Sequence, residues 1–391
     1  MKRKAGRYVL RAGEYKRSDG GYEYKYTDPA TGKKKSKSAR TIEELREKEE
    51  EINKAISNQL DMEKGDQTLN ELWDNFIELK RGTIKPATLA QRKRMYDKHI
   101  RNTRLGNMAI QNIKNSYVKS FYKSLKKDLS PASIGFIQKM IYSAMEQAVT
   151  DRAIPSNPFK NAITDIAREA TKKKKEALTD KEVEVLEEIS RHEHYGTLTR
   201  FLVRTGLRIG EVASLTWADI DESCSIIHVR RAFREYRDED GNMIRTIEAT
   251  KTDAGTRDLP ITSEIKSILE ERKAEKTQAT ENLEGYSGFV FCQTNGAIVS
   301  DKSFNRFLAK MSTKSIRIPN GITAHMLRRT YATREVLNGT DLFLLMYRMG
   351  HTSLSITSKF YINIAKSIEQ GEIKTDHDTA EKIARTARAV S

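Results

Sequence analysis

The sequence of 391 residues is poor in cysteine and tryptophan, with two residues of each, and it contains no long apolar segment. Cys224 and Cys292 have neither metal-ligand nor redox spacing, which argues against a disulfide framework and fits a reducing compartment. We expect both to be small core residues. No apolar run approaches the roughly 20 residues that cross a bilayer, and the first residues lack the apolar region of a signal peptide. The sequence therefore predicts a cytoplasmic protein without a membrane segment.

Two further absences limit the chemistry. No G-x-x-x-x-G-K-[ST] loop is present to cradle the phosphates of ATP. No carboxylate cluster suggests a two-metal nuclease. We therefore expect no metal, no cofactor and no nucleotide hydrolysis.

What the chain has in excess is positive charge. It carries 70 Lys and Arg against 54 Asp and Glu, a net charge of +16. Thirteen of these basic residues and only four acidic ones lie in residues 1–40. Such a balance is typical of nucleic-acid binders, although a merely soluble basic protein would also show it.

Pattern changes divide the chain into parts. Residues 1–60 first alternate aromatic and basic residues between turn signals, which predicts a small three-stranded sheet. Thr41 and Glu44 then form an expected capping box that opens a helix, so this part should be a small α+β domain. Residues 66–160 show apolar residues at helical spacing and predict an all-α domain. Residues 161–176 read as a basic linker. Residues 177–391 predict a mixed, mainly α domain whose polar tail begins at about residue 365.

Two stretches of the last part could carry chemistry. Arg208 lies in TGLRIGEVASL, where Gly206 can end one helix before the next begins, although a surface salt bridge to Glu211 would also explain it. Lys251 precedes a tight turn at residues 253–255 that joins two predicted strands. A lysine there extends a cationic arm, but most such lysines are simply solvated.

Four more candidate residues follow. His325 and Arg328 are three positions apart and share a helix face, as surface residues often do. His351 and Tyr361 lie in MGHTSLSITSKFY, residues 349–361, whose Ser, Thr and Lys content does not suggest core packing. A tyrosine near a helix end can also be a core residue with a wet hydroxyl.

Taken together, these residues fit phosphoryl transfer without a metal. Two guanidinium groups can clamp the negative charge that spreads over a phosphodiester in its transition state. The oxygen that leaves needs a proton donor, and the phosphate needs a nucleophile.

The order Arg, Lys, His-x-x-Arg, His, Tyr resembles the catalytic hexad of the tyrosine recombinases, the phage-integrase family. The resemblance implies the catalytic residues Arg208, Lys251, His325, Arg328, His351 and Tyr361. It also implies that residues 1–60 bind arm-type DNA sites, that residues 66–160 form a SAM-like core-binding domain, and that residues 177–391 form the catalytic domain. Arg329 departs from the pattern, since family members often have histidine there.

The resemblance also implies a mechanism. Tyr361 would attack a DNA phosphate and form a 3′-phosphotyrosine, releasing a 5′-hydroxyl that later attacks the partner strand. Arg208 and Arg328 would clamp the phosphate and His351 would contact it. Lys251 is the expected general acid, and His325 the expected proton handler. Glu211 would orient the first arginine.

The expected partner is double-stranded DNA at core-type and arm-type sites, bound by a homo-tetramer that can exchange its C-terminal tails. A directionality factor and a host DNA-bending protein are further expected partners, and the protein would associate with the bacterial nucleoid. The basic residues expected to face DNA are Arg7, Arg11, Lys16, Arg17, Lys25, Lys33, Lys34, Lys35, Lys172, Lys173, Lys174 and Lys175.

Three other functions stay open on the sequence. A type IB topoisomerase uses a similar constellation to nick and reseal one duplex. A DNA-binding regulator could keep the fold without catalysis, and an RNA-binding protein could use the tyrosine-rich N-terminal sheet. The last reading leaves the hexad unexplained.

Overall fold

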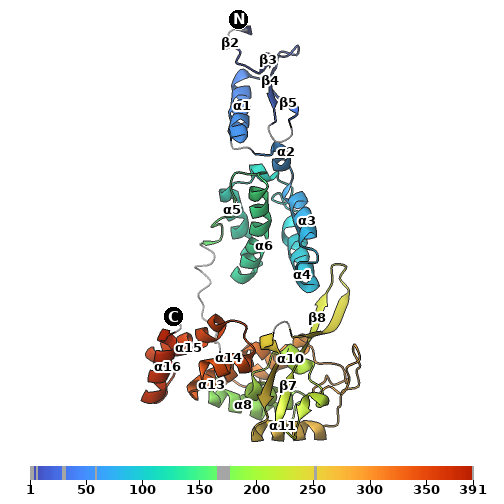
Figure 1. Ribbon diagram of the computed structural model, residues 1–391, viewed down its shortest axis with the longest axis vertical. Helices are drawn as coiled ribbons and strands as arrows, with labels where there is room; N and C mark the ends of the chain where they lie inside the picture. Colours follow the sequence, from blue (N-terminus) through green and yellow to red (C-terminus); the bar gives the residue numbers. More distant parts are fainter. Residues whose placement is uncertain are drawn as a thin grey trace. The chain divides into compact units, whose positions relative to one another are not determined.

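The computed structural model describes residues 4–5, 8–28, 32–57, 60–164, 177–250 and 253–389. Contacts divide the chain into two compact units, residues 1–172 with 237–242 and residues 173–236 with 243–391. The predicted order of a small sheet with a helix, a helical part and a mixed, mainly helical part is confirmed (Figure 1). Within the described residues, no helix combines the length and apolarity that a membrane crossing requires.

The N-terminal part is an antiparallel sheet covered on one face by a helix (Figure 1). Burial alternates along β4, so that Tyr24 and Tyr26 pack with Leu45 of the helix while Lys25 between them is exposed. The elements are β1 (Lys4–Ala5), β2 (Tyr8–Val9), β3 (Glu14–Lys16), β4 (Tyr22–Thr27), β5 (Lys34–Ala39) and α1 (Ile42–Ser57).

The predicted start of α1 is half confirmed. The hydroxyl oxygen of Thr41 accepts the backbone N–H of Glu44 at 3.2 Å. The Glu44 carboxylate accepts the N–H of Arg40 at 3.3 Å rather than completing the expected capping box on Thr41.

The helical part is a bundle in which local signals set the helix ends. Thr68 and Glu71 form a full capping box, and Pro131 stands in the first turn of its helix. Trp73 and Tyr96 stack at 4.5 Å between ring centroids in the core. The elements are α2 (Met62–Gly65), α3 (Leu69–Lys80), α4 (Pro86–Tyr96), a π-helical turn η1 (Asp97–Arg101), a 3₁₀ turn η2 (Ile110–Asn112), α5 (Asn115–Leu125) and α6 (Pro131–Thr150).

The second unit combines helices with two small sheets. Its sheets have the strand orders β10-β7-β6 and β8-β9. The elements are α8 (Asp180–Ser190), α9 (Gly196–Thr205), α10 (Ile209–Ala213), η3 (Trp217–Asp219), β6 (Ile220–Asp221), β7 (Ile226–Val229), β8 (Arg231–Arg237), β9 (Met243–Ala249), η4 (Asp253–Gly255), β10 (Arg257–Pro260), α11 (Ser263–Ala274), α12 (Asp301–Ser312), α13 (Ala324–Leu337), α14 (Leu342–Met349), α15 (Leu354–Glu369) and α16 (His377–Ala389).

The strands predicted on either side of residues 253–255 are present as β9 and β10, and the turn there is the 3₁₀ turn η4. The two strands do not pair with each other, because β9 lies beside β8 whereas β10 pairs with β7. One expectation for the cysteines is corrected. Cys292 is buried as expected, but Cys224 is exposed, since it lies in the turn between β6 and β7 and donates its backbone N–H to Asp221 at 2.9 Å.

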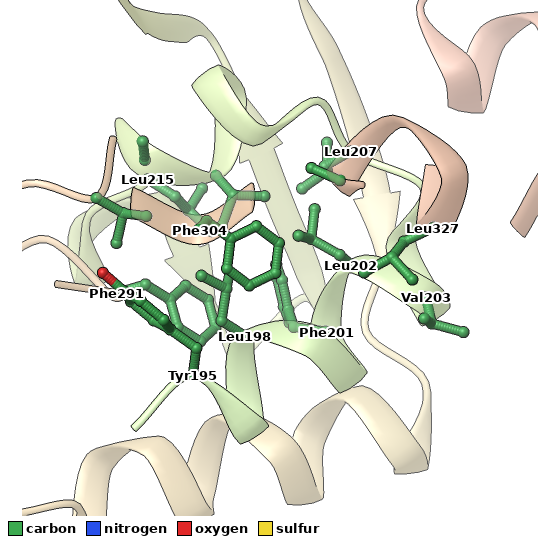
Figure 2. Close-up of a cluster of buried hydrophobic side chains, with 14 of the residues drawn as sticks. Tyr195, Leu198, Phe201, Leu202, Val203, Leu207, Leu215, Phe291, Phe304 and Leu327 are labelled. Atoms are coloured by element: carbon green, nitrogen blue, oxygen red, sulfur yellow. The ribbon is translucent and has the colours of Figure 1, made fainter. Parts of the chain in front are cut away.

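The core of the second unit gathers around α9 (Figure 2). Phe201 of α9 packs against Phe291 with ring centroids 5.1 Å apart, and Leu202 lies beside Leu327 of α13 in the same cluster. Because α9 and α13 share this core, the residue that ends α9 is held next to the middle of α13. This neighbourhood is where the predicted arginines meet.

A separate core joins the last four helices, α13 to α16 (Figure 1). Tyr361 of α15 and Ile383 of α16 are both buried in it. Helix α15 continues past residue 365 to Glu369, so the segment expected to be a polar tail starts later and folds largely as α16. In this structure α16 packs on α15 of its own chain.

Candidate active site

Arg208 stands at a junction of two helices, as predicted. Helix α9 ends at Gly206, whose φ of 62° is left-handed, and a Cβ there would lie 2.2 Å from the ring of Tyr331. The backbone N–H of Arg208 donates to Glu211 at 2.9 Å, and its guanidinium donates to Glu211 at 2.8 Å and to the carbonyl of Gly350 at 3.1 Å. The Arg208 side chain is 46% exposed, so its guanidinium is oriented by the protein while part of it faces solvent.

Glu211 is a buried anchor rather than half of a surface salt bridge. Its side chain is 3% exposed, and besides Arg208 it binds Arg257 at 2.9 Å. Burial alone would raise the pKa of this carboxyl, but the guanidiniums of Arg257, Arg328 and Arg208 lower it to about 2. Glu211 is therefore charged at neutral pH.

Arg328 is buried in α13, which contradicts the surface explanation. Its guanidinium donates to the carbonyl of Gly206 at 2.6 Å and to the carbonyl of Met349. Burial and the neighbouring charge of Arg208 lower the pKa of Arg328 to about 9, which still leaves it charged at neutral pH. Arg208 and Arg328 thus bind the consecutive carbonyls of Gly350 and Met349.

His351 comes directly after those two carbonyls. Its ring stacks on Phe360 with centroids 6.1 Å apart, and its Nδ1 lies 2.8 Å from the hydroxyl of Thr357. Burial and the charges of Arg328 and Arg208 lower the pKa of His351 to about 3. The imidazole is therefore neutral at physiological pH.

Tyr361 lies apart from these residues. It sits in the middle of α15 rather than near a helix end, is buried, and donates its hydroxyl to the carbonyl of Thr340. Burial and the carboxylates of Asp341 and Glu335 raise the pKa of Tyr361 to about 12. The phenol is neutral and bound in this state.

The two ends of α14 separate the tyrosine from the arginines. Thr340, which binds the Tyr361 hydroxyl, precedes α14, whereas Met349 and Gly350, which bind the arginines, end it. A helix of 8 residues is about 12 Å long. The structure therefore brings Arg208, Arg328, Glu211 and His351 together and leaves the Tyr361 hydroxyl at the far end of a helix.

The expectation that residues 349–361 avoid the core holds for only part of the segment, since residues 352–356 and Lys359 are exposed. Met349, His351, Thr357, Ser358 and Tyr361 are all buried. Ser and Thr are small enough to pack in α15, and the Thr357 hydroxyl finds a partner in His351.

Three predicted residues remain, namely Lys251, His325 and Arg329. Lys251 lies outside the described residues. His325 is in the first turn of α13 and is exposed, so it does not share the burial of Arg328 despite their spacing. Arg329 is half-buried next to Arg328.

One residue of this site was missed in the sequence, namely Arg257. It is the first residue of β10, where inward and outward positions alternate, and its side chain is 0% exposed. A charged residue at an inward strand position needs a buried partner, and here that partner is Glu211. The signal was present, but nothing in the sequence links positions 46 residues apart.

The pleat of the N-terminal sheet sorts the predicted basic residues. Lys25 and Lys34 belong to the face turned away from α1, since Lys25 alternates with buried tyrosines and Lys34 pairs with Thr27 of the same face. Lys35 pairs with Tyr26 on the helix side, and its ammonium lies 2.8 Å from the buried Asp28.

The other predicted basic residues differ in their surroundings. Lys16 and Lys33 are exposed. Arg11 lies 3.7 Å from Glu49, and Arg17 lies 3.0 Å from Asp19. Residues outside the described part of the chain are Arg7, Lys172, Lys173, Lys174 and Lys175.

The corner made by Arg208, Arg328 and His351 can bind a phosphate. It offers two guanidiniums, which bind the consecutive carbonyls of Met349 and Gly350, and the neutral imidazole of the next residue, and the Arg208 side chain is partly exposed. In the part of the chain that the structure describes, no group of three or more His, Cys, Asp and Glu side chains is placed to hold a metal ion.

Three family models match the sequence, one in each predicted part. They are described as the DNA-binding domain of the Tn916 integrase over residues 1–56, the phage integrase N-terminal SAM-like domain over 68–126, and the phage integrase family over 176–367. The chain belongs to the phage integrase family and is a tyrosine recombinase.

Individual proteins agree with this assignment. The transposase from transposon Tn916 of Enterococcus faecalis is 26% identical over 94% of each chain. The XerC-like tyrosine recombinase of Caldanaerobacter subterraneus is 27% identical over 87% of this chain and 90% of its own.

Solved structures show the same fold. The Tn1549 transposon integrase in complex with transposon right end DNA superposes with a TM-score of 0.68 at 25% identity, covering 83% of this chain and 100% of that one. The lambda integrase tetramer bound to a Holliday junction gives a TM-score of 0.55 at 20% identity, covering 89% and 94%.

Proposed function

We propose that this tyrosine recombinase is the integrase of a mobile element, and that it cuts and rejoins DNA through a 3′-phosphotyrosine formed on Tyr361. The observation that carries the proposal is the convergence of Arg208 and Arg328 on the carbonyls of Met349 and Gly350, directly before His351. These three groups would bind one phosphate together.

Each member of the corner has a role that follows from its surroundings. Arg208 would hold a non-bridging phosphate oxygen through the part of its guanidinium that faces solvent. Arg328, buried and charged beneath it, would stabilise the negative charge that develops in the transition state. Glu211 would fix the orientation of Arg208 through two hydrogen bonds.

The neutral His351 would act as a hydrogen-bond donor. When the hydroxyl of Thr357 donates to Nδ1, the ring proton is on Nε2, which can donate to a phosphate oxygen. Thr357 is then the residue that sets the tautomer. We propose Lys251 as the general acid for the 5′-oxygen and His325 as the residue that handles the tyrosine proton.

The proposal requires Tyr361 to move. Its hydroxyl must leave the carbonyl of Thr340 and reach the phosphate bound at the other end of α14. On this proposal, the bond from Tyr361 to Thr340 would belong to a closed state, and DNA binding or assembly would supply the free energy that opens it.

We further propose which part of the chain binds which DNA site. Residues 1–60 would bind arm-type sites through the sheet face that carries Lys25 and Lys34, and residues 66–160 with 177–391 would hold the core site. Most contacts would be to phosphates, so that affinity falls steeply with salt. Residues 161–176 would be the linker, and nearly all of them lie outside the described residues.

The assembly is proposed by analogy with the lambda integrase, which has been solved as a tetramer bound to a Holliday junction. Exchange of C-terminal segments would require α16 to leave α15 of its own chain. A directionality factor and a host DNA-bending protein would assist, and the enzyme would work at the bacterial nucleoid.

A covalent-adduct assay tests the proposal. The protein is incubated, without metal or ATP, with a nicked suicide duplex made from the ends of its own element, and the products are resolved on a denaturing gel. We expect an adduct with the wild-type protein, and none with Tyr361→Phe at equal DNA affinity. Salt-sensitive specific binding without any adduct would contradict the proposal and favour a DNA-binding regulator.

A further inference from the structure

Arg257 is a third arginine at the proposed active site, and it is buried like Arg328 and unlike Arg208. Its side chain is 0% exposed. Its Nε donates to the carbonyl of Arg348 at 2.7 Å, and its Nη2 donates to Glu211 at 2.9 Å. Its Nη1 donates to the carbonyl of Gly255 at 3.0 Å and to Glu211 at 3.3 Å. Both terminal nitrogens and Nε therefore bind within the protein.

The first partner of Arg257 is the residue that orients Arg208. Glu211 uses one carboxylate to bind the exposed arginine on one side and the buried arginine on the other. A carboxylate bound to one arginine alone can rotate, whereas one bound by two guanidiniums is fixed in its plane. The orientation of Arg208 therefore depends on Arg257.

The second partner is the end of α14. The last carbonyls of a helix have no partner within it and carry the negative end of its dipole. Here three consecutive carbonyls each accept a hydrogen bond from a different arginine. Arg257 donates to the carbonyl of residue 348, Arg328 to that of residue 349 and Arg208 to that of residue 350. His351 follows at once, so its position relative to the arginines is set by these bonds.

The packing around Gly350 is tight. Gly350 has a φ of 58°, and a Cβ there would lie 2.8 Å from Nη1 of Arg257 and 3.1 Å from the carbonyl of Ala254. The third partner, Gly255, belongs to the 3₁₀ turn η4, shortly after Lys251 in the sequence. Arg257 thus ties together the three chain segments that bear Arg208, His351 and this turn.

We propose that Arg257 is a positioning residue for strand cleavage: it holds Glu211 and the end of α14 so that Arg208 and His351 meet the same phosphate. This inference rests on the proposed function. A displacement of about 1 Å at a reacting centre can cost about 10²-fold in rate. We therefore expect loss of Arg257 to slow cleavage by about that factor without weakening DNA binding.

The test compares two buried arginines of the same unit. Arg272 is the control, because it is also buried and donates to the carbonyl of Val290 and to Cys292 without a bond to any proposed catalytic residue. Arg257→Met and Arg272→Met are assayed by single-turnover adduct formation on the nicked suicide duplex, at a temperature where circular dichroism shows both folded. We expect about 10²-fold slower adduct formation for Arg257→Met, with affinity within about twofold of wild type, and an unchanged rate for Arg272→Met.

A conservative variant and a double variant exclude a merely structural effect. Arg257→Lys keeps the charge and should recover part of the rate. Because Arg257 acts through Glu211, the double variant Glu211→Gln with Arg257→Met should be no slower than the slower single variant. The inference would be overturned if the rate losses of the two single variants multiplied in the double variant, or if Arg257→Met cleaved at the wild-type rate. In either case the wild-type adduct would still support the proposed function. If the wild type forms no adduct, the proposed function and the inference both fail.

Discussion

The two ends of α14 are in opposite states. At its C-terminal end, Arg208 and Arg328 are fixed by hydrogen bonds to the chain, and His351 is held neutral beside them. At its N-terminal end, Tyr361 is buried, bound to Thr340 and kept protonated. Under the proposed function, the C-terminal end of α14 would be a ready phosphate-binding half of the site and its N-terminal end would withhold the nucleophile, which would keep DNA intact until the enzyme has assembled on its sites.

Removing either arginine gives the largest expected effect and separates their roles. We expect Arg208→Ala and Arg328→Ala each to slow adduct formation by about 10²–10³-fold, because each removes a donor to the transition state. Only Arg328→Ala should also destabilise the fold, by about 2–4 kcal/mol, since it leaves buried carbonyls without donors. Chemical denaturation alongside the suicide assay distinguishes the two. Equal stability losses would contradict the distinction between an exposed and a buried arginine.

A smaller effect is expected at the residue that orients His351. Thr357→Val keeps the side-chain shape but removes the hydroxyl bound to Nδ1, so the ring can adopt the other tautomer. We expect adduct formation to slow by about tenfold. Thr199→Val is the matched control, because that buried hydroxyl binds only the carbonyl of Tyr195. A rate unchanged in both variants would mean that the tautomer is not set by Thr357.

The neutral state of His351 should also be visible in the pH dependence of the protein's stability. The pKa of His351 is lowered to about 3 in the folded protein, so below pH of about 6.5 the unfolded state binds a proton that the folded state does not. Stability should therefore fall as the pH falls, by about 1–2 kcal/mol between pH 6.5 and pH 5. Denaturation at the two pH values should show this loss in the wild type and a smaller one in His351→Asn. Identical losses would show that His351 is not held neutral.

The smallest expected effect concerns the withheld tyrosine. Lys382 of α16 donates to the carbonyl of Gly339 at 2.7 Å, next to Thr340, and so steadies the loop that binds the Tyr361 hydroxyl. We expect Lys382→Ala to speed adduct formation about two- to fivefold, the effect of losing one hydrogen bond of about 0.5–1 kcal/mol.

The control for this variant lies on the same helix. Arg385 is 73% exposed and pairs with Glu381 within α16. Arg385→Ala should leave the rate unchanged. Equal acceleration by Arg385→Ala would indicate that α16 as a whole, and not the Lys382 contact, restrains the loop.

These contrasts also show which features could be predicted. The order of the parts and the arginine junction followed from helix spacing, turn residues and the arrangement of the hexad. The pairing of Arg208 with Glu211 was also predicted, but the carbonyl partners of Arg208 and Arg328 were not, because backbone carbonyls leave no trace in the sequence. Arg257 was missed since its partner Glu211 is 46 positions away, and the burial of Tyr361 was missed because the neighbouring Ser and Thr residues looked like surface.

The most direct test of the central claim is to follow the Tyr361 hydroxyl itself. We would replace Tyr361 with 3-fluorotyrosine and record its ¹⁹F resonance against pH, without DNA and with an uncleavable core-site duplex. The account predicts that the free protein shows one resonance whose pKa lies well above that of free 3-fluorotyrosine, and that DNA shifts this resonance. A resonance that titrates like the free amino acid in the absence of DNA would mean that the nucleophile is already released, and would contradict the account.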